Sequence, residues 1–171
     1  MKRQILSFLL TAGATATLAL AQVNSADTRF MNKAAQGGMA EVKLGQLAID
    51  KGSNQAVKDF GQRMVTDHTN ANNQLQAIAS KDGVTLPTGL DAKDQATYDR
   101  LSKMSGMEFD RAYMRDMVKD HQMDVNEFRH ESQTAKNPDV KSFAQQTLPT
   151  LEEHLNLARQ DSSKVGLSAQ R

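Results

Sequence analysis

The chain has 171 residues, a length that suits one domain, and its 21 basic and 20 acidic residues give a net charge of +1 at pH 7. It contains no cysteine, which excludes disulfides and any thiolate ligand or nucleophile. It also has no tryptophan and no basic excess, so the composition excludes a nucleic-acid-binding groove with stacking platforms.

The first 21 residues are typical of an export signal. Two basic residues follow Met1, an apolar stretch covers residues 5–20, and Ala19-Leu20-Ala21 matches the small-x-small cleavage pattern. An uncleaved membrane anchor is the alternative, because the apolar stretch is nearly long enough to cross a bilayer. Cleavage would leave 171 − 21 = 150 residues without a second membrane span. We expect an exported protein, periplasmic or associated with the outer membrane.

Helical periodicity dominates the remaining sequence, and strand-like alternation is nearly absent. The first predicted helix covers about residues 27–51, with Asp27 or Ser25 as its N-cap. The second follows directly, with Ser53 or Asn54 as its N-cap, covers about residues 54–82 and ends at Gly83. The short link between them predicts an antiparallel hairpin.

A second helical pair follows an irregular connection that contains glycine and proline. A short amphipathic helix, capped by Asp91, is predicted within this connection. Long helices then cover about residues 107–135 and 138–165, the second with Asn137 as its N-cap, and residues 166–171 form a tail. The pattern predicts an all-α domain over residues 22–165, a four-helix bundle with a short extra helix in its central connection. It leaves open whether that connection crosses the length of the bundle or folds back on one end.

Each long predicted helix carries one residue of a metal-ligating type within its apolar stripe, near its middle. These residues are Glu41, His68, His121 and His154. A buried polar group is costly unless it is paired or ligated, so one such residue in each helix favours a shared site in the core. Carboxylate and imidazole ligands suit Zn, Fe or Cu, and four ligands from four helices could close a tetrahedral site.

Five further residues could support such a site. Asp67 and Asp120 each precede one of the histidines and could accept a hydrogen bond from a second imidazole nitrogen. Asp124 lies one turn beyond the second histidine and is a candidate additional ligand. Met64 and Met117 each lie four residues before a histidine, a pairing that copper tolerates, although methionine in an apolar stripe is ordinarily core filler.

The same constellation also fits a metal-free explanation. Glu41 and the histidines could form a buried polar network that fixes the register of the helices. His130 is excluded from either arrangement because it lies on the opposite face of its helix. Gly37, Gly38 and Gly45 in the first helix favour close helix packing over a ligand-binding gap.

Several motifs carry a resemblance to a known family. The first half contains Glu41-Val42-x-Leu44-Gly45-x-Leu47-Ala48 and Met64-Val65-x-Asp67-His68. The second half contains Phe109-Asp110-x-x-Tyr113, Met117-Val118-x-Asp120-His121 and Leu148-Pro149-x-Leu151-x-x-His154-Leu155. On these motifs, nearly the whole mature chain resembles a bacterial family of exported proteins known as domain of unknown function 4142. Members of that family are often labelled membrane or outer-membrane proteins.

The resemblance implies a ferritin-like antiparallel four-helix bundle and no established activity. Ferritin-like bundles suggest a di-iron carboxylate centre, which requires a Glu three residues before a His on two helices. Val65, Val118 and Leu151 occupy those positions here. A mononuclear site is therefore the better interpretation.

We expect an exported, non-catalytic bundle that binds one transition-metal ion for metal handling or envelope stress. A closed set of one glutamate and three histidines would suit a store or chaperone, which needs no open reactive position. The first alternative is a metal-free structural protein of the envelope, with other envelope proteins as partners. The second is a redox metalloenzyme, which would need an open coordination position.

Overall fold

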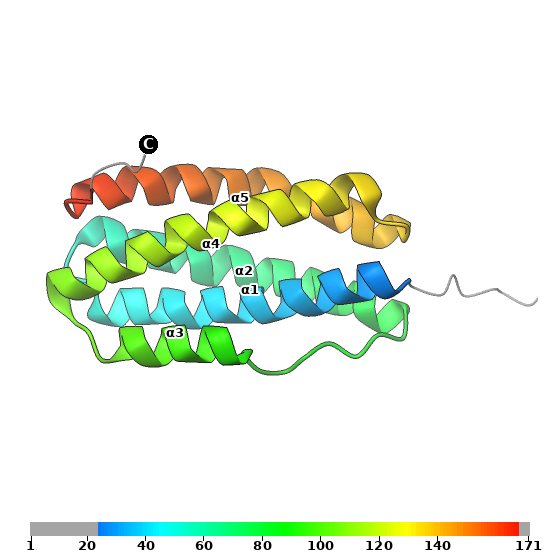
Figure 1. The fold of residues 1–171 in the computed structure, drawn as a ribbon, viewed down its shortest axis with the longest axis horizontal. Helices are drawn as coiled ribbons and strands as arrows, with labels where there is room; N and C mark the ends of the chain where they lie inside the picture. The colour runs from blue at the N-terminus through cyan, green and yellow to red at the C-terminus, as the bar shows by residue number, and fades with distance from the viewer. Residues whose placement is uncertain (1–23, 168–171) are drawn as a thin grey trace, which may run out of the picture.

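The computed structural model describes residues 24–167, most of which lie in five α-helices. The helices are α1 (Ser25–Lys51), α2 (Gln55–Lys81), α3 (Ala92–Ser102), α4 (Gly106–Thr134) and α5 (Pro138–Lys164). Four long helices lie side by side, and α3 lies along the outside of the bundle (Figure 1). This architecture confirms the predicted all-α bundle with a short extra helix in its central connection. The predicted export signal, residues 1–21, lies outside the described residues.

Asparagine side chains begin three of the long helices. Asn24 accepts hydrogen bonds from the backbone N–H groups at the start of α1, and Asn54 and Asn137 do the same for α2 and α5. Each such cap contributes about 1 kcal/mol to helix stability. The predicted caps Asn54 and Asn137 are confirmed, whereas Asp27 and Ser25 are wrong for α1 because Asn24 fills that position. Asp27 is left free for a contact in another part of the bundle.

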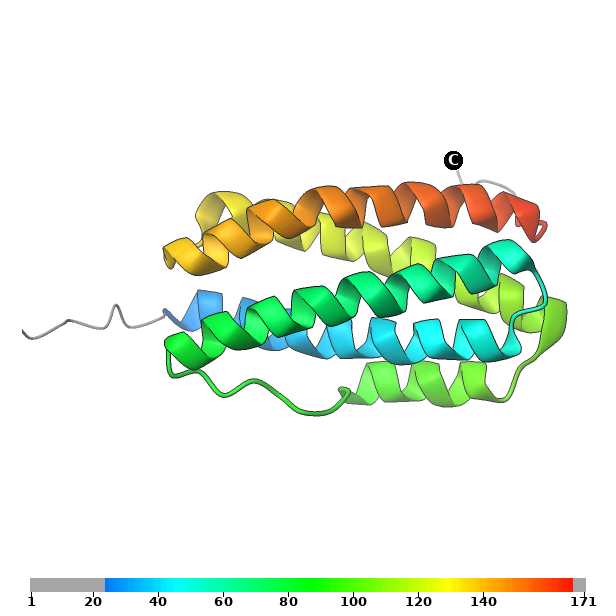
Figure 2. The same cartoon turned by 180° about the vertical axis from the view of Figure 1, so that it is seen from behind.

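Two buried aspartates fix the direction of the second hairpin. Asp27, at the start of α1, accepts a 2.7 Å hydrogen bond from the backbone N–H of Asn137 in the α4–α5 turn. Asp110, at the start of α4, accepts hydrogen bonds of 3.0 and 2.9 Å from the backbone N–H groups of Ser53 and Asn54 in the α1–α2 turn. The start of each hairpin therefore lies beside the turn of the other, and α2 and α4 run in the same direction. The connection through α3 crosses the length of the bundle, as both faces show (Figures 1 and 2).

The core consists of two apolar clusters, one toward each end of the bundle. One cluster includes the start of α1 and the end of α2, where Phe30 and Phe128 meet at a ring-centroid distance of 5.0 Å. The other includes the end of α1 and the start of α2, where Phe60 and Tyr113 meet at 6.2 Å. The polar residues of the predicted stripes lie between the two. On α1, α2 and α4, the predicted site residue falls between members of one cluster and members of the other, and on α5 it lies one turn before the first member of the second cluster, Ala158.

Glycines bring α1 and α2 into close contact. A Cβ at Gly45 would lie 2.7 Å from the carbonyl oxygen of Gly61, and a Cβ at Gly61 would lie 2.7 Å from the Cβ of Ala48. Real Cβ atoms do not approach so closely, so neither position accepts a larger residue without a shift of the helices. The close-packing prediction is confirmed for Gly45. Gly37 and Gly38 have a different environment, described below.

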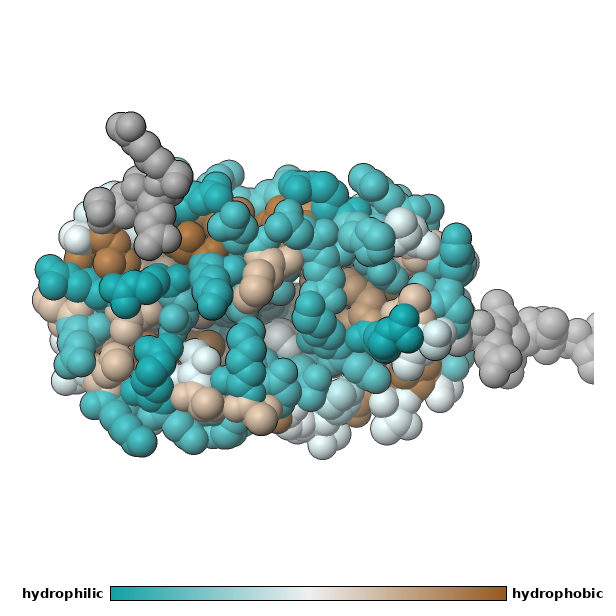
Figure 3. Space-filling model, viewed as in Figure 1, coloured by the Kyte–Doolittle hydropathy of each residue, from teal (hydrophilic) through white to brown (hydrophobic). Residues whose placement is uncertain are grey.

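The face drawn in Figure 3 is mostly hydrophilic, with small and separate hydrophobic areas. Met107 and Met123, both on α4, are the large apolar side chains most exposed among the described residues, at 47% and 39%. None of the helices between residues 24 and 167 combines the length and the apolar content that a membrane span requires.

Candidate metal centre

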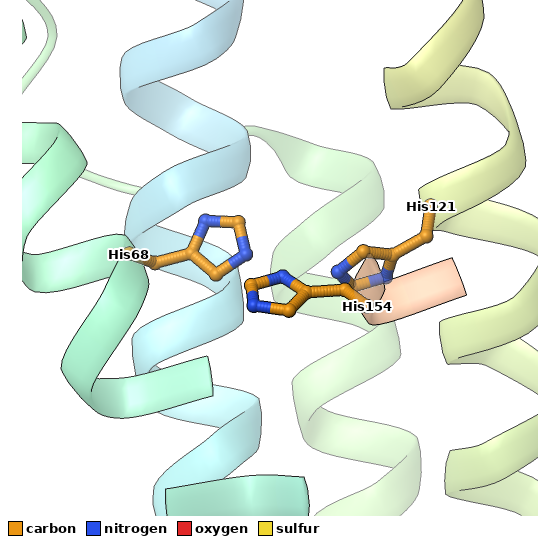
Figure 4. Close-up of side chains that lie close together, drawn as sticks. All are labelled: His68, His121 and His154. Carbon is orange, nitrogen blue, oxygen red and sulfur yellow. The ribbon is translucent and has the colours of Figure 1, made fainter. Parts of the chain in front are cut away.

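Three histidines from three different helices meet in the middle of the bundle. His68 of α2, His121 of α4 and His154 of α5 each offer a ring nitrogen, and these nitrogens all lie within 4.8 Å of one another. The ring centroids are 5.4 to 5.8 Å apart, and Figure 4 shows the three rings pointing toward a common centre. All three residues are buried, with exposed fractions of 7% or less. We call these three residues the histidine trio.

One nitrogen of each ring in the histidine trio has no hydrogen-bond partner. These atoms are Nε2 of His68, Nε2 of His121 and Nδ1 of His154. A buried polar atom without a partner costs about 1–3 kcal/mol. Five of the eight buried side-chain atoms without a partner in the described residues belong to this trio and to Glu41. The cost is therefore concentrated at one place in the core.

Asp67 of α2 orients the ring of His154 across the bundle. Its Oδ2 lies 2.8 Å from Nε2 of His154, and because a carboxylate only accepts, the nitrogen carries the hydrogen. Arg63, one turn before Asp67, donates to the same oxygen at 3.2 Å. The bond leaves Nδ1 of His154 as the lone-pair nitrogen that faces the other two rings. A carboxylate behind a histidine is the usual support of a metal-ligating imidazole.

A backbone carbonyl orients the ring of His121 so that its free nitrogen also faces the other two rings. Nδ1 of His121 lies 3.0 Å from the carbonyl oxygen of Met117, one turn earlier on α4. A carbonyl only accepts, so Nδ1 carries the hydrogen and Nε2 presents its lone pair to the histidine trio. Two of the three rings thus have a fixed tautomer with the free nitrogen inward.

The surroundings of the histidine trio favour neutral imidazoles. Burial, and then the neighbouring His121 and His154, lowers the pKa of His68 well below its ordinary value. Burial, and then His154, lowers the pKa of His121 from 6.5 to about 4. Burial lowers the pKa of His154 as well, although Asp67 opposes that shift. All three rings therefore hold lone pairs at neutral pH, which metal binding requires.

Glu41 lies beside the histidine trio without joining it. Its carboxyl is fully buried, and its Oε1 lies 4.0 Å from Nδ1 of His121, the nitrogen that donates to Met117. Burial raises the pKa of Glu41 well above its ordinary value, and Asp120 and Asp124 raise it further. The structure thus brings three of the four predicted ligands together and leaves the fourth next to one of them.

The other residues predicted to support the site fall into three environments. Asp120 lies 3.5 Å from Nζ of Lys93 on α3, and it accepts no hydrogen bond from a histidine. Asp124 lines a cavity next to His68. Met64 and Met117 lie in the apolar cluster that contains Phe60 and Tyr113, as residues that only fill the core do. His130 is exposed, as its position on the helix predicts.

The sequence did not single out two aromatic residues of this layer. The ring of Phe60 lies 6.1 Å from that of His121 and 6.5 Å from that of His154, both edge-on. The hydroxyl of Tyr113 is buried without a partner, and burial together with Glu41 raises the pKa of this phenol well above its ordinary value. Both residues belong to predicted apolar stripes, and Tyr113 also ends the Phe109-Asp110-x-x-Tyr113 motif, but neither pattern assigned them to the site.

The fold and the site define an all-α bundle with a buried trio of histidines at its centre. The chain belongs to the family described as domain of unknown function DUF4142, whose family model matches residues 12–160. No curated protein matches this sequence. The resemblance found in the motifs is thus confirmed over most of the chain.

Two solved structures share the fold at low sequence identity. A DUF305 fragment from Deinococcus radiodurans matches with a TM-score of 0.73 and 14% identity, over 83% of this chain and 98% of that one. A candidate secreted protein of DUF305 from Streptomyces coelicolor matches with a TM-score of 0.72 and 13% identity, over 86% of this chain and 98% of that one. Identities this low establish a shared fold and nothing further.

Proposed function

We propose that the protein binds one divalent transition-metal ion through His68, His121 and His154. The observation that carries the proposal is the convergence of three buried ring nitrogens, none of which has a hydrogen-bond partner. A single ion at their centre would satisfy all three atoms at once. No rearrangement of the helices is needed, because the three ligands already come from separate helices at one level.

The distances support this reading. Nitrogens bound to one ion at about 2.0–2.1 Å lie at most about 4.2 Å apart. The ring nitrogens of the histidine trio lie within 4.8 Å of one another, so a small inward rotation of the rings brings them into range. Three neutral imidazoles suit Zn, Cu or Fe, and the bond from Asp67 to His154 is the support such a ligand requires.

The metal-free network explains the same residues less well. In a stabilising polar network the members hydrogen-bond to one another. Here the inward nitrogens of the three rings have no hydrogen-bond partner, and Glu41 lies 4.0 Å from His121, beyond hydrogen-bonding distance. A network whose histidines do not bond to one another would leave three unpaired nitrogens at one place in the core.

For the role of the bound ion we propose metal handling outside the cytoplasm. The sequence of the first 21 residues predicts export, and the Streptomyces coelicolor neighbour is itself described as a candidate secreted protein. Periplasmic and outer-membrane locations both fit this proposal.

A second candidate function follows from the position of Glu41. Structural zinc sites use four protein ligands, whereas catalytic sites use three and leave a position open. The histidine trio supplies three, and Glu41 lies outside it. A metalloenzyme is therefore the alternative, and consumption of oxygen or peroxide by the metal-loaded protein would favour it over a store or chaperone.

Elemental analysis of the mature protein, purified without a histidine tag, tests the main proposal. We expect one ion per chain after dialysis against Zn, Cu or Fe, and loss of that ion in His68→Ala, His121→Ala and His154→Ala. His130→Ala, a histidine exposed on α4, is the matched control and should retain the ion. Equal metal content in all four variants would overturn the proposal.

A further inference from the structure

A small cavity lies next to one residue of the histidine trio. Its volume is about 30 Å³, and its walls come from all four long helices. The cavity has room for water. His68 is the member of the trio that lines it. Because His68 is more than nine-tenths buried and its Nε2 has no partner, the cavity borders a buried residue of the candidate centre.

The cavity exists because α1 carries two glycines at this level. A Cβ at Gly38 would lie 2.1 Å from Oδ1 of Asn72, so this glycine leaves room for the Asn72 side chain on α2. A Cβ at Gly37 would meet nothing within 4 Å. Gly37 is half-buried and lines the cavity, so the space beside it is unfilled. The predicted preference for close packing is wrong at Gly37.

Oxygen-bearing side chains line the outer part of the cavity. Asp124 and Glu127 contribute carboxylates from α4, and Asn72 contributes an amide. Lys33 of α1 forms an ion pair with Glu127, and 69% of the lysine side chain is exposed. The lining of the cavity therefore includes both a surface ion pair and the buried His68.

We infer that this cavity is the passage by which a hydrated divalent cation reaches the histidine trio, with Asp124 holding the cation on its way. The inference rests on the proposed function. Exposed fractions of 7% or less in the trio mean that an ion needs a route through the bundle. Carboxylate and amide oxygens suit a partly hydrated cation in transit, and the imidazoles beyond them bind transition metals more tightly.

The electrostatics of Asp124 agree with this role. Burial, and then Asp120 and Glu127, raises the pKa of Asp124 from 3.8 to about 8. Lys33 and Lys93 oppose this shift without cancelling it. A cation in the cavity would supply further positive charge and displace the proton.

Stopped-flow measurement of Co²⁺ or Zn²⁺ uptake, and of release to a chelator, tests the passage. Gly37→Leu places a side chain in the unfilled space and should slow uptake and release by about tenfold or more, a barrier of about 1.4 kcal/mol, at unchanged equilibrium affinity. The variant should fold, because leucine favours a helix more than glycine does. Gly89→Leu, at a glycine that also has open space around it, is the control and should match the wild type.

Asp124→Asn tests the transit ligand. It should slow uptake more than it changes affinity, whereas Asp59→Asn, an exposed aspartate on α2, should leave the rate unchanged. Wild-type rates in both Gly37→Leu and Asp124→Asn would overturn the passage and leave the metal site standing. A wild-type protein that takes up no ion would instead overturn the proposed function, and the passage with it.

Discussion

Asp67 on α2 accepts a hydrogen bond of 2.8 Å from Nε2 of His154 on α5, and this bond turns the other nitrogen of the ring toward His68 and His121. The bond joins two helices that belong to different hairpins. Asp67 precedes His68 in the sequence, but the histidine that it supports is His154. The histidine trio therefore depends on a residue that touches no ion.

Replacing Asp67 by asparagine should weaken metal binding without unfolding the protein. Asparagine retains the shape of the side chain but no longer favours the tautomer of His154 that faces inward. Loss of such a supporting carboxylate typically costs about 10–100-fold in metal affinity. Competition titration with a chromophoric chelator measures the change. Asp59→Asn, at an exposed position of α2, provides the control. Equal metal affinities of Asp67→Asn and Asp59→Asn would contradict the role assigned to Asp67.

Glu41→Gln should make the metal-free protein more stable in mildly alkaline solution. In the unfolded chain a glutamate ionises near pH 4.5, whereas burial keeps the pKa of Glu41 well above that value in the folded protein. Above pH 4.5 the folded state therefore binds more protons than the unfolded chain does. As the pH rises, the free energy of unfolding falls by up to about 1.4 kcal/mol per pH unit. Glutamine has the same shape and no proton to lose.

Urea denaturation at pH 4, 6 and 8 measures this difference. The advantage of Glu41→Gln over the wild type should grow from pH 4 to pH 8, and metal binding should persist because Glu41 lies outside the histidine trio. A variant less stable than the wild type at pH 8 would mean that Glu41 is ionised and paired. Loss of the metal in this variant would restore Glu41 as a fourth ligand.

Metal affinity should resist acid further than an ordinary histidine site. The ion binds the neutral rings, and the pKa of His121 is lowered to about 4 while those of His68 and His154 are also lowered. Protons therefore compete for His121 only as the pH approaches about 4, and for the other two rings below the ordinary range of a histidine. Between about pH 7.5 and 5.5 we expect the affinity to fall less than that of a site made of solvent-exposed histidines, which take up protons in this range.

The stability of the metal-free protein, unlike the metal affinity, should be sensitive to mild acid. Unfolded histidines take up protons below about pH 6.5, before the folded ones do, so the free energy of unfolding falls as the pH drops through this range. Circular dichroism alongside the titration verifies that the protein is folded at each pH. An affinity that falls steadily from pH 7 in folded protein would show that the histidines are not buried as described.

Two glycines on the same helix should respond oppositely to alanine. Gly45→Ala forces a Cβ against the carbonyl of Gly61 and should destabilise the protein by about 1–3 kcal/mol. Gly37→Ala has open space and should stabilise it by up to about 1 kcal/mol, because alanine favours a helix. Urea denaturation of both variants provides the comparison. Equal effects would contradict the close approach of α1 and α2.

The sequence predicted the helices and the height of the site, because the period of 3.6 residues assigns each side chain to a face and a level. Asn54, Asp91 and Asn137 were recognised as caps by their residue type. Periodicity contains no information on the rotation of one helix against another. It therefore could not show that Glu41 approaches His121 at its donating nitrogen and stays outside the histidine trio.

The direction of the central connection was beyond the sequence for a related reason. Two long-range contacts decide it, from Asp27 to Asn137 and from Asp110 to Ser53, each more than fifty residues apart in the chain. Both aspartates look like ordinary acidic residues near the start of a helix. The same limit applies to the bond between Asp67 and His154, which spans 87 residues.

X-ray absorption spectroscopy of the zinc-loaded mature protein shows whether the histidine trio binds the ion. We expect one ion per chain with three imidazole nitrogens at about 2.0–2.1 Å, at most one further light ligand and no sulfur. The His121→Ala variant should lose this signature. A sulfur neighbour, which only a methionine could supply in this cysteine-free chain, or a spectrum unchanged in His121→Ala, would exclude binding by the histidine trio.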